Sequence, residues 1–192
     1  MPKTKITREM VVDAAFEIAR TMGIENVNAR TVSEKAGCST QPVMYHFARI
    51  EELKRAVYEK ADCFHSDYLM SVTNPEEGTM LGIGLNYIRF AIREPNLFRF
   101  LFQSGYVVGN SLPEMIESEE LKPLLAMISA AMELTIEQTK EVFVTIALFA
   151  HGYASIIANN SLEYDEKEVA VHLERAYRGA VLEVKTNPDG GN

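Results

Sequence analysis

The sequence is poor in cysteine and shows neither a secretory leader pattern nor an internal repeat. Two cysteines among 192 residues, Cys38 and Cys63, are too few for a disulfide framework and are typical of a protein in a reducing cytoplasm. No apolar run follows the basic start of the chain, so no signal peptide is expected. We therefore expect a cytoplasmic globular protein, either one domain or a small module fused to a larger one.

Long uncharged segments and strand patterns are also scarce. The apolar stretch from Val142 to Ala158 contains His151 and Gly152, and it is at the short limit of the roughly 17–25 residues that cross a bilayer. We interpret it as a buried interface helix, with a membrane span as the weaker alternative. No convincing alternation of apolar and polar residues is present, so the sequence predicts an all-α protein.

The patterns of enzymes and metal proteins are missing as well. No spacing of a nucleophile and a base stands out. Cys63 and Asp67 would share one face of a helix, but His65 would point nearly the opposite way, so one helix cannot close a metal site there. We predict no catalytic residue, no metal and no cofactor.

Positive charge is scarce overall but unevenly distributed. The net charge is −8, which by itself argues against a nucleic-acid partner. Residues 1–56, however, hold nine Lys/Arg and seven Asp/Glu, or +2, whereas the remainder holds 10 basic and 20 acidic residues, or −10. This asymmetry makes the beginning of the chain the only plausible nucleic-acid-binding part.

Apolar residues recur with helical period along nearly the whole chain. Thr7, Asn28 and Ser39 are suitable N-caps, and Gly23 and Gly37 are suitable ends, for three helices near the N-terminus. Further helical segments are expected at 50–74, 76–93, 97–102 and 120–132, from a capping box at 135–138 to about 159, and from a similar start at 165 to about 184.

Residues 29–47 have the layout of a helix-turn-helix, because two short helices flank a glycine-containing turn after a longer amphipathic helix. Ala36 is small enough for close helix packing, and Gly37 accepts the positive φ that the turn requires. Thr40 and Gln41 begin the second short helix, where polar side chains reach base edges, and a glutamine can bond adenine through two atoms.

The sequence resembles the TetR family of bacterial repressors over residues 7–57. The resemblance is carried by Ala36-Gly37-x-Ser39, by Tyr45-His46-Phe47 and by Glu51-Glu52-Leu53. It implies an N-terminal three-helix DNA-binding domain over 1–49, a helical effector-binding and dimerisation domain over 50–186, and a disordered tail over 187–192.

The residues expected to contact DNA lie in the two short helices and just after them. They are Arg30, Thr31, Ser39, Thr40, Gln41, Tyr45, His46 and Arg49. Val43 and Phe47 are expected to pack inside. The family usually has tyrosine where this chain has Met44 and lysine where it has Ile50, both as phosphate contacts. We expect the neighbouring Tyr45 and Arg49 to substitute for them.

The resemblance also implies an effector cavity and a dimer in the remainder of the chain. Candidate ligand residues are Tyr87, Phe90, Phe98, Phe102, Met127 and His151, whose aromatic and thioether groups suit an apolar effector. For any single one of them a core position is the better interpretation, and for His151 a satisfied core or interface histidine. Candidate dimer residues are Phe149, Gly152, Ile156, Leu173, Tyr177 and Val181.

Taken together, these patterns predict a ligand-responsive transcriptional regulator rather than an enzyme. The expected form is a homodimeric repressor that a small apolar effector releases from a palindromic double-stranded DNA operator, with no membrane partner. An activator would use the same residues. The alternatives are an all-helical small-molecule carrier or enzyme that has lost sequence-specific DNA binding, and a pure dimerisation adaptor.

Overall fold

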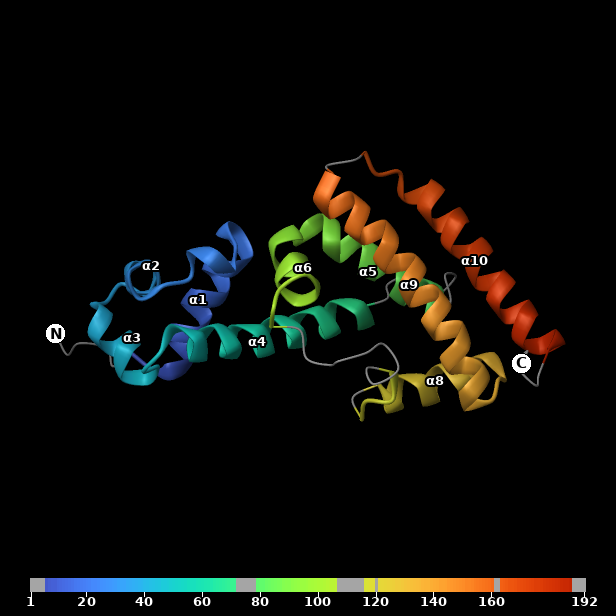
Figure 1. Ribbon diagram of the computed structural model, residues 1–192, viewed down its shortest axis with the longest axis horizontal. Helices are drawn as coiled ribbons and strands as arrows, with labels where there is room; N and C mark the ends of the chain where they lie inside the picture. Colours follow the sequence, from blue (N-terminus) through green and yellow to red (C-terminus); the bar gives the residue numbers. More distant parts are fainter. Residues whose placement is uncertain (1–5, 72–78, 107–115, 120, 161–162, 188–192) are drawn as a thin grey trace. The chain divides into compact units, whose positions relative to one another are not determined.

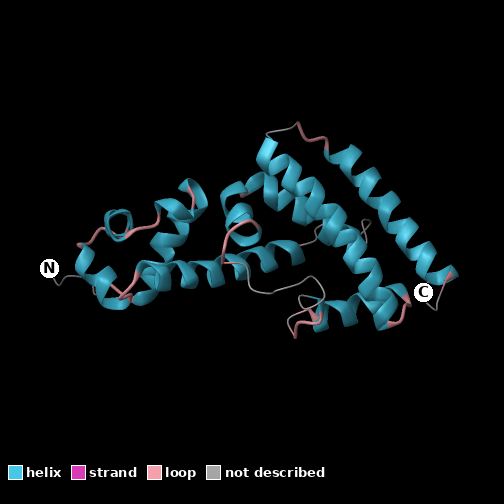
Figure 2. Ribbon diagram, viewed as in Figure 1, coloured by secondary structure: helices cyan, strands magenta, loops and turns pink. Residues whose placement is uncertain are grey.

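The computed structural model of the chain describes residues 6–71, 79–106, 116–119, 121–160 and 163–187. Figure 1 shows its helices, which are α1 (Arg8–Met22), the 3₁₀ helix η1 (Ile24–Asn26), α2 (Ala29–Lys35), α3 (Thr40–His46), α4 (Ile50–Met70), α5 (Thr79–Arg93), α6 (Pro95–Phe102), α8 (Lys122–Met132), α9 (Ile136–Asn160) and α10 (Glu166–Thr186). The described residues contain no strand (Figure 2), which confirms the all-α prediction.

The predicted helix starts are confirmed where a side chain caps the backbone. The Thr7 hydroxyl accepts a hydrogen bond from the Met10 amide at 3.2 Å, and α1 begins at the next residue. At the start of α9, the Gln138 amide donates to Thr135 Oγ1 at 3.2 Å and the Thr135 amide to Gln138 Oε1 at 3.0 Å, which is a capping box. Asp165 caps α10 in a similar way.

The chain divides into two compact units, which differ from the predicted domains. The first unit comprises residues 1–67 and 94–107, and the second comprises 68–93 and 108–192. The expected boundary after residue 49 would separate α4 and α6 from the three N-terminal helices. In the structure, α4 as far as Asp67 and α6 belong to the same compact unit as those helices. The expected tail lies outside the described residues, apart from Asn187.

Side-chain contacts explain why α4 and α6 belong to the first unit. The Phe16 and Phe64 rings of α1 and α4 meet edge to face with centroids 5.7 Å apart. Lys60 Nζ lies 2.6 Å from Asp13 Oδ1. α6 is tied to α1 because Asn96 Nδ2 donates to the Arg20 carbonyl at 3.0 Å. These contacts continue the core that α1, α2 and α3 share.

Branched apolar side chains from α1 to α4 contribute to the core of the first unit. Val11 of α1, Val32 of α2, Val43 of α3 and Leu53 of α4 are fully buried. Phe47, directly after α3, is also buried, and the Arg8 guanidinium lies 4.8 Å from its ring centroid. The predicted inward positions of Val43 and Phe47 are therefore confirmed, and α3 is held by one face.

In the second unit α5, α9 and α10 pack against one another, and α8 packs on α9. Gly84 of α5 allows a close approach, because a Cβ there would lie 2.9 Å from Leu173 Cδ2 of α10. The buried Asn86 donates from Nδ2 to the carbonyls of Tyr68 and Leu69 at 3.3 and 3.2 Å. It thereby satisfies two backbone acceptors at the end of α4.

α9 is long and apolar enough to span a membrane by length and composition. In the second unit its buried side includes Val142, Ile146, Ala150 and Ala154, and this side packs in a helical bundle. One side of the helix is therefore buried within the second unit, whereas Leu148 and Ile156 of the same helix are exposed, and a core helix passes the same test of composition.

Candidate nucleic-acid interface

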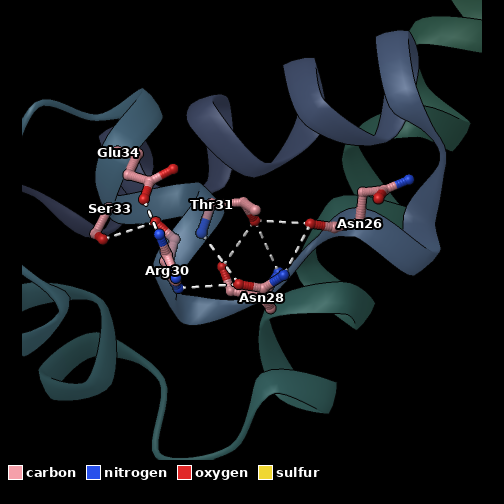
Figure 3. Close-up of polar contacts among 6 residues, drawn as sticks. All are labelled: Asn26, Asn28, Arg30, Thr31, Ser33 and Glu34. Atoms are coloured by element: carbon pink, nitrogen blue, oxygen red, sulfur yellow. Dashed lines mark hydrogen bonds and ion pairs between the residues drawn. The ribbon is translucent and has the colours of Figure 1, made fainter.

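A hydrogen-bond network fixes the start of α2 (Figure 3). Asn28 Oδ1 accepts from the amides of Arg30 and Thr31, both at 3.1 Å. The Thr31 hydroxyl accepts from the Asn28 amide at 3.2 Å and donates to the Asn26 carbonyl at 2.7 Å. Asn28 and Thr31 thus cap each other, which fixes the point where the chain enters the helix-turn-helix.

The turn between α2 and α3 is a Schellman motif. The Cys38 amide donates to the Ser33 carbonyl at 2.9 Å, and the Gly37 amide donates to the Glu34 carbonyl at 3.3 Å. Gly37 has φ +65°, and no atom would lie within 4 Å of a Cβ there. The glycine is therefore required by the backbone conformation rather than by crowding, as the sequence predicted.

α3 presents a mixed polar and apolar surface to solvent. Thr40, Gln41, Met44 and Tyr45 are exposed, whereas Val43 is buried. Tyr45 is 82% exposed, which is a large value for an aromatic side chain. The exposed side chains project from a short helix whose other face is anchored in the core. This is the geometry of a helix that enters a major groove.

Three of the residues predicted to contact DNA, Thr31, His46 and Ser39, differ in how their side chains are hydrogen-bonded within the protein. The Thr31 hydroxyl is engaged in the cap of α2, and His46 Nε2 donates to the Ile6 carbonyl at 2.9 Å. These two side chains position the backbone and are only half exposed. Ser39 is exposed at the N-cap of α3, but its side chain makes no capping hydrogen bond, so its hydroxyl is not committed to the helix.

The predicted cationic contacts lie on the surface in weak ion pairs. Arg30 Nε is 2.9 Å from Glu34 Oε1, and Arg49 Nε is 3.1 Å from Glu52 Oε1. The arginine side chains are 84% and 80% exposed. Exposed pairs of this kind contribute about 0–1 kcal/mol, so a phosphate can compete for either arginine.

The sequence did not predict the ties between α1 and α6. Arg20 of α1 forms a bidentate ion pair with the buried Glu94, which precedes α6. The partners are 74 residues apart, so no local pattern joins them. The sequence offers only a glutamate beside a proline, Glu94-Pro95, and this specifies neither burial nor a partner.

The candidate ligand residues do not form one group. In the second unit, the Tyr87 hydroxyl lies 2.9 Å from His151 Nδ1, and Phe90 packs edge to face on Tyr68. Burial raises the pKa of Tyr87 and lowers that of His151, so both groups are neutral near pH 7. Met127 is exposed on α8.

The remaining two aromatic candidates belong to the first unit. Phe98 is fully buried, and its ring centroid lies 5.2 Å from that of Phe102. A hollow of about 260 Å³ in this unit is lined by residues of α1 and α4, including Arg8, Asp13 and Lys60. None of the six candidate ligand residues lines this hollow.

The candidate dimer residues lie on α9 and α10 with unequal exposure. Ile156 is exposed, and Phe149, Gly152, Tyr177 and Val181 are half buried. Leu173 is fully buried against Gly84 within its own unit, so its side chain is not available to a second subunit. Exposed apolar side chains that we had not singled out flank the others on the same two helices, namely Leu148, Val171 and Leu182.

Comparison with known proteins identifies the fold. No family model matches the chain. An uncharacterised helix-turn-helix-type transcriptional regulator of Bacillus subtilis, YobS, is 22% identical over 169 residues, which are 86% of each chain.

Solved structures give the same result. A TetR family member from Streptomyces coelicolor is 17% identical with a TM-score of 0.56, over 88% of this chain and 96% of that one. A TetR-like transcriptional regulator from Rhodococcus sp. RHA1 is 16% identical with a TM-score of 0.57, over 89% and 93%. The multidrug binding protein EbrR in complex with ethidium is 17% identical with a TM-score of 0.54, over 88% and 97%. The chain thus has the fold of TetR-family regulators.

Proposed function

We propose that this protein, which has the TetR-family fold, is a DNA-binding transcriptional regulator that inserts α3 into the major groove. The observation that supports this best is the outer surface of α3, where Thr40, Gln41 and Tyr45 are exposed on a helix anchored by Val43. In this proposal the Gln41 amide and the Thr40 hydroxyl bond base edges, the Tyr45 hydroxyl bonds a phosphate, and the buried face of α3 keeps the helix in register with the groove.

The surrounding polar groups are assigned to the phosphate backbone. Arg30 and Arg49 are exposed and can exchange their glutamate partners for phosphate oxygens. The free hydroxyl of Ser39 is a further donor at the same edge of α3. Thr31 and His46 act indirectly in this proposal, because their hydrogen bonds hold α2 and the segment before α1 in place.

We assign dimerisation to the outer surfaces of α9 and α10. Leu148 and Ile156 of α9 and Leu182 of α10 are each more than half exposed. A two-fold pairing of these helices would remove the exposed apolar groups from water and place two copies of α3 on one DNA. A symmetric dimer would select a palindromic operator with half-sites about one turn, roughly 34–36 Å, apart.

We place effector binding in the second unit, beside Tyr87 and His151. This pair offers a neutral hydroxyl and imidazole among apolar helices, which suits an aromatic or apolar molecule with a single polar group. The similar protein EbrR was solved with ethidium, an observation in favour of an aromatic effector. Binding would shift the population toward a form that does not fit the operator. A typical coupling of about 1–3 kcal/mol weakens DNA binding roughly 5–150-fold.

The test of the proposed function is selection of random duplex DNA by the purified protein at about 0.15 M salt, followed by sequencing. We expect an enriched palindrome. The matched control replaces Thr40, Gln41 and Tyr45 by alanine, which leaves the buried face of α3 intact. Equal recovery of all sequences by the folded wild-type protein would overturn the proposal and favour a carrier or an enzyme.

Three accompanying proposals concern the location of the protein, its lack of enzymatic activity and the sign of regulation. We place it in the cytoplasm, because a regulator of this kind must reach chromosomal DNA. We also expect no enzymatic activity, since the regulator fold and the exposed α3 surface account for its principal features. A repressor is proposed over an activator, and transcription from a promoter that carries the selected operator decides between them.

A further inference from the structure

Met44 is an exposed apolar residue on the surface of α3 that we assign to DNA. It is 46% exposed, and it lies one helical turn after Thr40 and Gln41 and directly before Tyr45. A single exposed methionine needs no explanation on an ordinary surface. On α3 it does, because the groups around it are polar and the proposed partner carries a charge on every phosphate.

The chemistry of the thioether limits what Met44 can contact on DNA. Its sulfur is a weak acceptor and has no proton to donate, so it cannot bond a phosphate oxygen. The base edges of the major groove present acceptors, amino donors and one apolar group, which is the C5-methyl of thymine. A flexible, polarisable side chain packs well on such a methyl group.

Resting on the proposed function, we infer that Met44 is a specificity-determining residue that packs on the methyl group of one thymine in each half-site. Tyr45 and Arg49 then contact the phosphates, which they can reach because both side chains are exposed. Gln41, one turn before Met44, contacts a neighbouring base pair. The operator therefore contains a thymine that is selected for its methyl group rather than for its hydrogen bonds.

The experiment replaces each thymine of the selected operator by deoxyuridine, which differs only by the missing methyl group. We expect the replacement to weaken binding of the wild-type protein at one symmetric pair of positions. Loss of the methyl group in one half-site should weaken binding about fourfold, which corresponds to one methyl-sized apolar group, and loss in both half-sites about 15-fold. Met44→Ala should weaken binding to the normal operator and make the protein indifferent to deoxyuridine at those positions. Met22→Ala, which alters an exposed methionine of α1, should respond as the wild type does.

The possible outcomes separate this inference from the proposed function. If no operator is selected at all, the proposed function fails, and the inference with it. If an operator is selected but no thymine position responds to loss of the methyl group, the inference alone is overturned. The inference alone is also overturned if the Met44→Ala variant still loses as much affinity as the wild type when deoxyuridine replaces thymine. Met44→Ala replaces an exposed helix residue with a good helix former, so loss of folding is not expected to obscure the result.

Discussion

Arg20 and Glu94 form a bidentate ion pair between α1 and the start of α6, with Nε to Oε2 at 2.8 Å and Nη2 to Oε1 at 2.5 Å. The glutamate side chain is 10% exposed and the arginine side chain 37%. The hydrogen bond to Glu94 raises the pKa of Arg20, so the arginine keeps its positive charge. The pair therefore links α1, the helix before the helix-turn-helix, to the residue that precedes α6.

Glu94→Gln should destabilise the protein because it leaves the arginine with a weaker acceptor in a largely buried place. We expect the free energy of unfolding to fall by about 1–3 kcal/mol in urea titrations. Glu17→Gln is the matched control, since Glu17 lies 3.9 Å from the same arginine in an exposed pair and should change stability by less than about 0.5 kcal/mol. Equal effects of the two variants would contradict a special role for Glu94.

Gln41→Ala should relax base preference. Loss of a bidentate contact costs about 1–3 kcal/mol on the selected operator and much less on random DNA. The measurement is a pair of binding isotherms at one salt concentration. Equal loss on both DNAs would show that Gln41 positions the protein without contacting a base.

Arg49→Ala should weaken binding to all DNA sequences to a similar extent. Because one phosphate contact is lost, the slope of log K against log salt should flatten by about one unit. Arg55→Ala is a suitable control, because this exposed arginine lies further along α4. An unchanged slope for Arg49→Ala would exclude it as the phosphate contact near the position of Ile50.

Gly37→Ala should strain the Schellman turn through φ alone, because the space around its Cα is open. We expect a loss of about 1–2 kcal/mol in the free energy of unfolding. Gly37→Asn should cost less, because asparagine tolerates the left-handed region. Thermal melts of the two variants compare them directly, and an equal loss would point to crowding rather than to backbone conformation.

His65 should make stability depend on pH. Burial lowers the pKa of His65 from 6.5 to about 4, and its ring packs against Phe102. Between pH 6.5 and about pH 4 this histidine is protonated in the unfolded chain but not in the folded one, so the free energy of unfolding falls as the pH is lowered. The loss reaches about 3 kcal/mol near pH 4 and is absent above pH 7.

The control for this pH dependence is His65→Gln, which cannot titrate. Other groups also titrate between pH 7 and pH 4, so the informative quantity is the difference between the two proteins. We expect the wild type to lose more stability than the variant over this range in urea titrations. Parallel curves would show that His65 has an ordinary pKa in the folded protein.

Local signals predicted most of the helices and the turn of the candidate site. The caps at Thr7 and Thr135 and the glycine at position 37 each depend on residues a few positions apart, so the sequence contains all of their determinants. The burial of Val43 follows from helical period in the same way.

Features that depend on distant partners were not predictable. Nothing near Glu94 identifies Arg20 as its partner, and nothing near Gly84 indicates that Leu173 fills the space beside it. We expected Leu173 at a dimer interface, but its side chain is buried within its own unit. The division of the chain after 67 rather than after 49 has the same cause, because it reflects packing of α6 on α1.

The first unit is assembled from two separate stretches of sequence, and this limits how such proteins can be recombined. A chimera that takes only residues 1–49 from this chain would lack Glu94 and Asn96, and it would leave the carboxyl end of α1 facing foreign side chains. A chimera that keeps these contacts of the first unit therefore carries residues 94–106 together with the N-terminal segment. Evolution by shuffling of contiguous segments faces the same constraint, whereas point substitution on the surface of α3 does not.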